Sequence, residues 1–348
     1  MKFLRFILFP FAIVYGLITV VRNVFYQTAI FKPSKFSIPI INVGNLSTGG
    51  TGKTPHTEYL IRLLKQEKNL FTLSRGFGRK VRGFIIADKQ STAFQIGDEP
   101  LQYQLKFGNE IGVAVDANRV TGVMDICRTH PNTNLILLDD AFQHRAIHAG
   151  LNILITDYSK PFFTDFMLPV GNLRELRAGK KRAQIIVVSK CPNFDTVDKA
   201  FFIKKINPLK GQHVFFSKIN YSSVFGLADF VETDKLTNQK IILVTGIANA
   251  KPLVTFLEKN NSILHHFNFQ DHYNFKQENI TEIHKIFDKF AAENPVIITT
   301  EKDAMRLLND PLKTSLKGYP WFFQSIEIEI NKKEEFDKIV LHYVEKNS

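Results

Sequence analysis

The apolar positions of this chain fall into short continuous runs that alternate with segments in which apolar residues recur every three or four positions. The short runs predict strands buried on both faces, and the periodic segments predict amphipathic helices. In the first part of the chain the predicted strands are 37–43, 70–73, 84–87, 111–115, 135–138, 151–156 and 184–189. The predicted helices are 56–65, 99–106, 119–129 and 197–206. This alternation predicts an α/β fold with a parallel, helix-covered sheet.

The pattern changes after residue 210. The segments 214–222 and 321–330 both predict β structure, the second through the near-alternation of its Ile and Glu residues. Between them lies a second series with strands 241–245, 264–267 and 296–299 and helices 251–258, 277–289 and 302–308. We interpret this series as a smaller α/β domain joined to the first by two β connectors, and we expect a final helix, 333–344, to pack back on the first domain.

The N-terminal residues 6–21 form an apolar run with basic residues before and after it. The run is shorter than the roughly 20 residues that span a bilayer, and Pro10 and Gly16 weaken it as a helix. A helix lying in the headgroup region, held by its basic flanks, fits this pattern best. The alternatives are a buried core helix, a signal peptide and a membrane span.

Composition narrows the class of partner. The chain has 348 residues and 44% hydrophobic content, which suits a folded protein of about two domains. Its 45 basic and 33 acidic residues give a net charge of +12, which favours anionic partners such as phosphates, anionic lipid or nucleic acid. Its two cysteines, Cys127 and Cys191, form no C-x-x-C pair, so we expect no zinc site and a reducing compartment.

The segment after the first predicted strand carries the strongest chemical signal. It consists of Asn45, Leu46, Ser47, Thr48, Gly49, Gly50, Thr51, Gly52, Lys53, Thr54 and Pro55. A strand, a small-residue loop ending in Gly-Lys-Thr and a helix make up a P-loop, whose backbone N–H groups bind phosphates. We expect Lys53 to reach the β- and γ-phosphates and Thr54 to place its hydroxyl on Mg²⁺. Ser47 stands where the usual spacing has glycine; the alternative is an ordinary glycine-rich turn.

A second signal is the apolar run 135–138, which ends in Asp139 and Asp140. Mg²⁺ prefers hard oxygen ligands, and a Walker B element places such carboxylates at the carboxyl end of a strand. By itself this pattern also fits a helix cap or a turn. Together with a P-loop it predicts a magnesium site.

Four further segments carry candidate residues, each with an ordinary alternative. The segment 74–80 combines three cations with glycines and predicts an anion site or a solvated basic turn. Asp98 is either a helix N-cap or a general base. Asp271 and His272 suit proton transfer, although most histidines are not catalytic. Arg174 could neutralise phosphate charge or lie in a surface segment.

Together these segments resemble the tetraacyldisaccharide 4'-kinase family of Gram-negative bacteria. The residues that carry the resemblance are the N-terminal apolar helix, 43–55, 74–79, 97–100, 138–145, 168–177, 271–272 and 300–304. The resemblance implies transfer of a phosphoryl group from ATP, with Mg²⁺, to the 4'-hydroxyl of a lipid-linked glucosamine disaccharide 1-phosphate. It also implies monotopic attachment to the cytoplasmic face of the inner membrane.

The resemblance assigns roles to particular residues. Asp98 would be the base, with support from His272 in the other domain. Asp139 and Asp140 would serve the magnesium and phosphate sites, and Arg174 and Glu175 would lie near the phosphates, with Glu175 among the expected metal ligands. The expected nucleotide-binding residues are Asn45, Ser47, Thr48, Gly49, Gly50, Thr51, Gly52, Lys53, Thr54 and Arg174. The expected domains are a membrane-surface helix (1–30), a P-loop kinase core (31–210), a smaller α/β domain with its connectors (211–330) and a C-terminal helix (331–348).

Two other classes of function compete with a lipid kinase that acts as a monomer on an anionic membrane. A regulatory or metal-delivery GTPase would share the P-loop, but the chain lacks an N-K-x-D run for reading guanine and a Cys/His cluster for metal. A nucleic-acid-binding protein would share the basic charge, but the basic residues are spread along the chain rather than gathered in a stripe with aromatics. We therefore expect no nucleic-acid partner.

Overall fold

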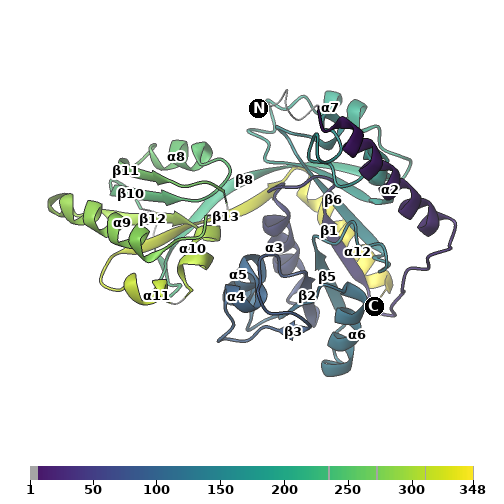
Figure 1. The fold of residues 1–348 in the computed structure, drawn as a ribbon, viewed down its shortest axis with the longest axis horizontal. Coiled ribbons are helices and arrows are strands. Elements are labelled where there is room, and N and C mark those ends of the chain that lie inside the picture. The colour runs from purple at the N-terminus through teal and green to yellow at the C-terminus, as the bar shows by residue number, and fades with distance from the viewer. Residues whose placement is uncertain (1–6, 234–235, 272, 310, 348) are drawn as a thin grey trace.

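The computed structural model describes residues 7–233, 236–271, 273–309 and 311–347. These residues form two lobes that share one continuous sheet (Figure 1). The predicted fold class, a P-loop type parallel sheet with a smaller α/β domain joined by β connectors, is confirmed.

The first lobe is a mostly parallel sheet with helices on both faces. Its strands are β1 (Ile40–Gly44), β2 (Leu70–Ser74), β3 (Ile85–Ile86), β4 (Gly112–Val115), β5 (Leu135–Asp139), β6 (Leu151–Asp157) and β7 (Ile185–Ser189). Its helices are α3 (Lys53–Leu64), α4 (Ala93–Ile96), α5 (Asp98–Phe107), α6 (Arg119–Thr129) and α7 (Lys199–Ile206), with 3-10 turns η1 (Phe162–Thr164) and η2 (Arg177–Arg182). The strand β1 lies between β5 and β6. The loop that follows β1 therefore emerges near the middle of the row of carboxyl ends of the first lobe's strands.

The second lobe repeats the strand–helix alternation on a smaller scale. Its elements are β9 (Glu232–Thr233), β10 (Lys240–Thr245), α8 (Lys251–Leu257), β11 (Ser262–Asn268), α9 (Gln277–Lys289), η3 (Ala291–Glu293), β12 (Val296–Thr300), α10 (Glu301–Leu307) and α11 (Leu312–Ser315). The strands β10, β11 and β12 are parallel, and their apolar residues pack against α9 and α10.

Two long strands connect the lobes. β8 (His213–Gly226) and β13 (Trp321–Ile330) pair antiparallel, and each also pairs with one lobe: β8 is parallel to β7, and β13 is parallel to β12. The sheet order is β11-β10-β12-β13-β8-β7-β6-β1-β5-β2-β4-β3, with β9 paired to β8. Because hydrogen bonds run across both connectors, the sheet is continuous from one lobe to the other.

The C-terminal helix α12 (Lys333–Asn347) packs on the first lobe, as the sequence predicted. Phe336 and Val340 are buried in the core that also contains α3. The hydroxyl of Tyr343 donates to the carbonyl oxygen of Ile40 at 3.1 Å, at the start of β1. Helix α12 therefore supports the strand that leads into the P-loop.

The N-terminal helix α2 (Phe9–Gln27) is longer than the apolar run that predicted it. Pro10 does not weaken it, because it lies in the first helical turn, where no intrahelical N–H bond is lost. α2 is the one helix among the described residues that is long and apolar enough to cross a membrane, and only 17% of its apolar window is buried. It therefore leaves a broad apolar face uncovered.

Candidate functional site

The P-loop connects β1 to α3. The positions with left-handed backbone are Gly49 (φ +97°) and Gly52 (φ +94°), conformations that favour glycine. Ser47 instead pairs with Leu173 in an isolated β-bridge, and any residue can adopt that extended backbone. This explains why serine stands where the usual P-loop spacing has glycine.

The carbonyl oxygens of the loop are held from outside by hydrogen bonds. The hydroxyl of Ser189 donates to Thr51 O at 2.6 Å, the ammonium of Lys190 donates to Gly50 O, and the amide of Gln143 donates to Asn45 O at 2.7 Å. The side chain of Asn45 also donates to the Thr51 hydroxyl at 2.9 Å. With these oxygens bound, the first-turn N–H groups of α3 remain as the phosphate-binding end of the helix.

Lys53, Asp140 and Arg174 form a charged group beside this loop. Lys53 Nζ lies 3.6 Å from Asp140 Oδ2, and Arg174 Nη2 lies 2.8 Å from Asp140 Oδ1. Although burial opposes ionisation of Asp140, Lys53 and Arg174 hold its pKa below the ordinary value. Arg174 also donates to the side chain of Asn45 and to Ser47 O at 3.3 Å. The structure therefore brings together the lysine, the arginine and the carboxylate that the sequence predicted.

Asp139 lies at the carboxyl end of β5 and is fully buried. Tyr103 donates to its Oδ2 at 2.9 Å, whereas its Oδ1 has no hydrogen-bond partner among the described residues. Burial and the nearby carboxylate of Glu99 raise the pKa of Asp139 to about 7, against the effect of Lys53. A buried carboxylate oxygen without a partner, close to other carboxylates, fits a divalent cation. The residues present therefore suit Mg²⁺.

Thr54 extends the same oxygen-rich region. Its hydroxyl donates to Glu99 Oε1 at 3.3 Å, which connects the P-loop helix to the first turn of α5. In the part of the chain that the structure describes, no three His, Cys, Asp or Glu side chains gather as a complete metal cluster. That is the usual situation for Mg²⁺, which takes one or two protein carboxylates and completes its shell with phosphates and water.

Asp98 is not the N-cap of α5. Gly97, with φ +94°, occupies that position, and Asp98 is the first helical residue. Its carboxylate instead forms an ion pair with Arg306 of α10, with Nε and Oδ2 at 2.8 Å. A side chain on Gly97 would meet Phe77 O at 2.8 Å, so glycine permits the loop after β2 to lie against this turn.

His272, predicted to support Asp98, lies outside the described residues. Its neighbour Asp271 lies within the described part of the second lobe. Burial lowers the pKa of Lys302, against the opposing effect of the nearby carboxylates, Asp271 and Asp98 among them. Asp271 and Asp98 therefore both act on one ammonium group between the lobes.

Glu175, predicted as a metal ligand, has both carboxylate oxygens engaged by protein groups. Arg182 donates to Oε1 at 2.8 Å and to Oε2 at 2.9 Å, and Gln143 donates to Oε1 at 3.0 Å. Asn23 of α2 donates to Oε2 at 3.4 Å. Through Asn23 and Gln143, Glu175 therefore connects α2 to the phosphate-binding loop.

A cationic cluster meets Asp140 through Arg119. It comprises Arg22, Arg75 and Arg119, which all act on the neighbouring His144, and Arg75 also acts on Arg119. Arg119 is buried and donates to Asp140 O at 3.4 Å and to Ala117 O at 2.9 Å. Burial first, and then Arg119, Arg22 and Arg75, lower the pKa of His144. Such a cluster is suited to an anionic group.

Comparison with known proteins gives the family. The family model for LpxK, described as Tetraacyldisaccharide-1-P 4'-kinase, matches residues 4–345. The chain belongs to the tetraacyldisaccharide 4'-kinase family. The predicted activity, that of an ATP-dependent 4'-kinase of lipid A biosynthesis, is thereby confirmed.

Relatives and a solved structure of this kinase family match the chain along its whole length. A tetraacyldisaccharide 4'-kinase of Flavobacterium johnsoniae is 42% identical over 349 residues, covering 100% of this chain and 99% of that protein. One of Bacteroides thetaiotaomicron is 40% identical over 357 residues, covering 98% and 93%. A crystal structure of LpxK from Aquifex aeolicus in complex with ATP has a TM-score of 0.77 and 27% identity, covering 98% and 99%.

Several residues at the site of this tetraacyldisaccharide 4'-kinase were not predicted from the sequence. His56 is buried in the first turns of α3, where its ring contacts Gly52 O and the Ser217 hydroxyl at 2.6 and 2.9 Å. Burial lowers the pKa of His56 to about 4, so the ring is neutral. Its two hydrogen bonds hold the loop in place. Arg306 and Glu99 were also missed. Only Glu99 had a sequence signal, since it follows Asp98 directly.

Proposed function

We propose that the chain phosphorylates the 4'-hydroxyl of a tetraacyldisaccharide 1-phosphate with Asp98 as the general base. The hydroxyl oxygen forms a bond to the γ-phosphorus of ATP, the bond from that phosphorus to the ADP oxygen breaks, and the hydroxyl proton passes to the Asp98 carboxylate. One observation carries this proposal: Thr54, in the first turn of α3, donates a hydrogen bond to Glu99, the neighbour of Asp98. The base and the phosphate site are thus adjacent.

In this proposal the P-loop and two cations bind the triphosphate. Lys53 exchanges its contact with Asp140 for the β- and γ-phosphates, and Arg174 supports the same negative charge. Thr54 and Asp139 would hold Mg²⁺, which supplies charge neutralisation at the phosphates when bound. Asp140 then fixes the two cations rather than the metal. Glu175 is left out of the metal site, because its oxygens are already engaged.

We place the acceptor's 1-phosphate at the cationic cluster of Arg22, Arg75 and Arg119, beside His144. The cluster approaches the site through Arg119, which donates to the backbone of Asp140. Arg22 belongs to α2, so the cluster also adjoins the helix that we expect to contact lipid. A phosphorylated headgroup would therefore meet cations as it leaves the bilayer surface.

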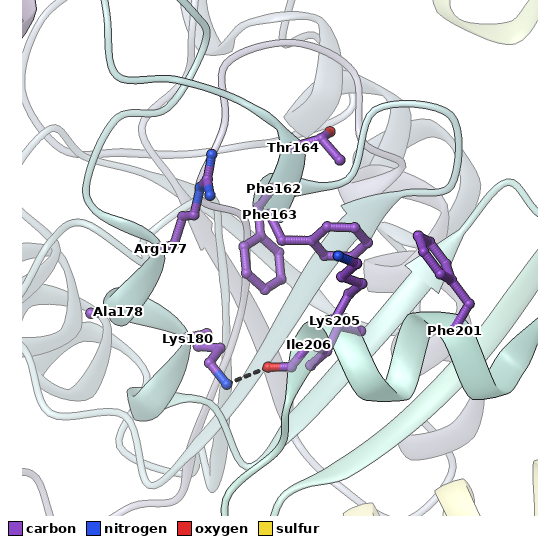
Figure 2. Close-up of a pocket in the computed structure, with 9 residues that line it drawn as sticks. All are labelled: Phe162, Phe163, Thr164, Arg177, Ala178, Lys180, Phe201, Lys205 and Ile206. Carbon is purple, nitrogen blue, oxygen red and sulfur yellow. Dashed lines mark hydrogen bonds between the residues drawn. The ribbon is translucent and has the colours of Figure 1, made fainter.

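We propose that α2 lies on the membrane surface and that the surface formed by η1, η2 and α7 lies beside it. The hydroxyl of Tyr15 in α2 donates to Arg174 O at 3.0 Å, three residues before η2 begins. η1, η2 and α7 line an open pocket of about 560 Å³, with phenylalanine and cationic side chains around it (Figure 2). It is lined by Phe162, Phe163, Thr164, Arg177, Ala178, Lys180, Phe201, Lys205 and Ile206.

Apolar walls and basic side chains together suit an anionic bilayer surface. We place this surface on the cytoplasmic face of the inner membrane, where ATP is available, and we propose that the enzyme works as a monomer. Removal of residues 1–22 would then shift the protein from the membrane fraction to the soluble fraction. Sedimentation of the truncated protein with membranes would place the attachment elsewhere.

The experiment that tests the reaction uses purified protein, radiolabelled ATP and a tetraacyldisaccharide 1-phosphate fraction. We expect label to enter the lipid in wild-type protein, and we expect Asp98→Asn to bind ATP normally while losing about 100- to 10,000-fold in kcat. Wild-type turnover in Asp98→Asn would show that another group takes the proton.

A further inference from the structure

One charged contact joins the two lobes at the proposed base. Nε of Arg306, on α10 of the second lobe, lies 2.8 Å from Oδ2 of Asp98, the first residue of α5. The Arg306 side chain is 8% exposed and the Asp98 side chain is 27% exposed. Because the pair is largely shielded from water, its geometry constrains both side chains more than a surface ion pair would.

Arg306 is itself fixed by the second lobe. Its Nη1 donates to Asp303 Oδ1 at 3.0 Å, and Asp303 is fully buried. The other oxygen of Asp303 accepts from the Gly246 N–H at 2.8 Å and from the Thr300 hydroxyl at 2.6 Å. These bonds anchor the Asp303 carboxylate, so the guanidinium group is oriented independently of Asp98.

We propose that Arg306 is a positioning residue for phosphoryl transfer. By holding one oxygen of the Asp98 carboxylate, it fixes the rotation of that group and presents the other oxygen to the acceptor hydroxyl. A base that is free to rotate spends less time in the reactive geometry, and small misplacements of reacting groups are costly. This inference rests on the proposed role of Asp98, and it adds that the second lobe orients the base of the first.

The same two helices offer a matched control. Lys106 of α5 and Glu301 of α10 form a second ion pair between the lobes, with Nζ and Oε1 at 2.6 Å. This pair also joins α5 to α10, but among the described residues neither Lys106 nor Glu301 forms a hydrogen bond or ion pair with Asp98. Glu301→Gln therefore alters the attachment between the helices without altering the contact at the base.

A double-mutant cycle tests the proposal with the full-length enzyme. We expect Arg306→Gln to lower kcat by about 10- to 100-fold, with the KM for ATP changed less than about two-fold. We expect Arg306→Gln combined with Asp98→Asn to be no slower than Asp98→Asn alone, because a positioning residue acts only through the group it orients. Arg306→Lys keeps the charge without the planar fork, so it should recover only part of kcat. Glu301→Gln should stay within about two-fold of wild type.

The outcomes separate this inference from the proposed function. Wild-type kcat in Arg306→Gln, or a loss that multiplies fully with that of Asp98→Asn, overturns the positioning role while leaving the base in place. Wild-type kcat in Asp98→Asn overturns the base itself. Circular dichroism and thermal unfolding accompany each variant, and a kcat loss that follows the fraction of unfolded protein also overturns the positioning role. If Arg306→Gln does not fold, Arg306→Lys replaces it in the cycle.

Discussion

In the first lobe, the chemical groups stand at the carboxyl ends of parallel strands and in the loop after β1, whereas in the second lobe they stand on α10 and in the segment ahead of α9. Lys53 directly follows the loop after β1, and Asp139 is the last residue of β5. Asp303 and Arg306 instead form a buried ion pair on α10. The guanidinium group of Arg306 reaches from this pair to Asp98 of the first lobe. The first lobe thus carries the phosphate chemistry, and the second lobe acts on it through side-chain orientation.

The difference also shows in how each lobe manages buried charge. In the first lobe, Asp139 Oδ1 has no partner among the described residues, which suits a site that receives a cation. Between the lobes, Lys106 is enclosed by two carboxylates, Glu58 and Glu301, both at 2.6 Å. An open buried carboxylate is suited to binding, whereas a closed charge network is suited to holding two helices in register.

The largest effect is expected in the first lobe. Lys53→Ala should lower the rate of lipid phosphorylation by about 1,000-fold, because a preorganised positive charge at the transferred phosphoryl group is lost. The fold should be retained, since Lys53 forms an ion pair with Asp140 beside the loop and takes no part in the apolar core. Radiolabel transfer and circular dichroism measure the two properties. Near-wild-type transfer would remove the P-loop assignment and the contrast between the lobes.

A stability effect is expected at the joint between the lobes. Lys106→Met should lower the free energy of unfolding by about 3 kcal/mol, because two buried carboxylates lose their shared cation. Lys333→Met is the control: the Lys333 side chain is 65% exposed, so its pair with Asp337 should be worth less than about 1 kcal/mol. Urea unfolding measures both. Equal losses in the two variants would show that the joint is not held by buried charge.

A membrane-binding effect is expected on α2. Leu17→Asp should weaken binding to anionic vesicles by about ten-fold, because one exposed apolar side chain no longer enters the lipid. Met124→Asp on α6 is the matched control, since Leu17 and Met124 are each 58% exposed. Vesicle co-sedimentation measures the change. If both substitutions weaken binding alike, general charge rather than α2 governs attachment.

The smallest effect is a change in pH dependence. Burial, with Glu58 adding to it and Lys106 opposing it, raises the pKa of Glu301 from 4.5 to about 7. Between these values the unfolded chain has released the proton that the folded chain keeps, so this residue makes stability fall as pH rises through the window. Glu301→Gln should flatten that part of the profile in urea unfolding between pH of about 4.5 and about 7.5. An unchanged slope would mean that Glu301 is ionised throughout.

The alternation of strands and helices, the P-loop and the acidic end of β5 were all predicted from the chain alone. These features depend on residues close together in the chain, where the period of apolar residues and the small-residue spacing act directly. The helices 119–129 and 277–289 were predicted with the bounds that α6 and α9 have. β3 was predicted as 84–87 but pairs only at Ile85 and Ile86, since it is an edge strand with one neighbour.

Which charges meet depended on the packing of distant segments. Asp98 was predicted as an N-cap or a base, but its partner Arg306 lies 208 positions away and was given no role. Glu175 was predicted as a metal ligand, yet the fold surrounds it with Arg182 and Gln143. Local periodicity carries no information about such contacts, because they depend on how β8 and β13 set one lobe against the other. The chain pattern therefore specifies the parts of the site, and the packing of the lobes specifies their partners.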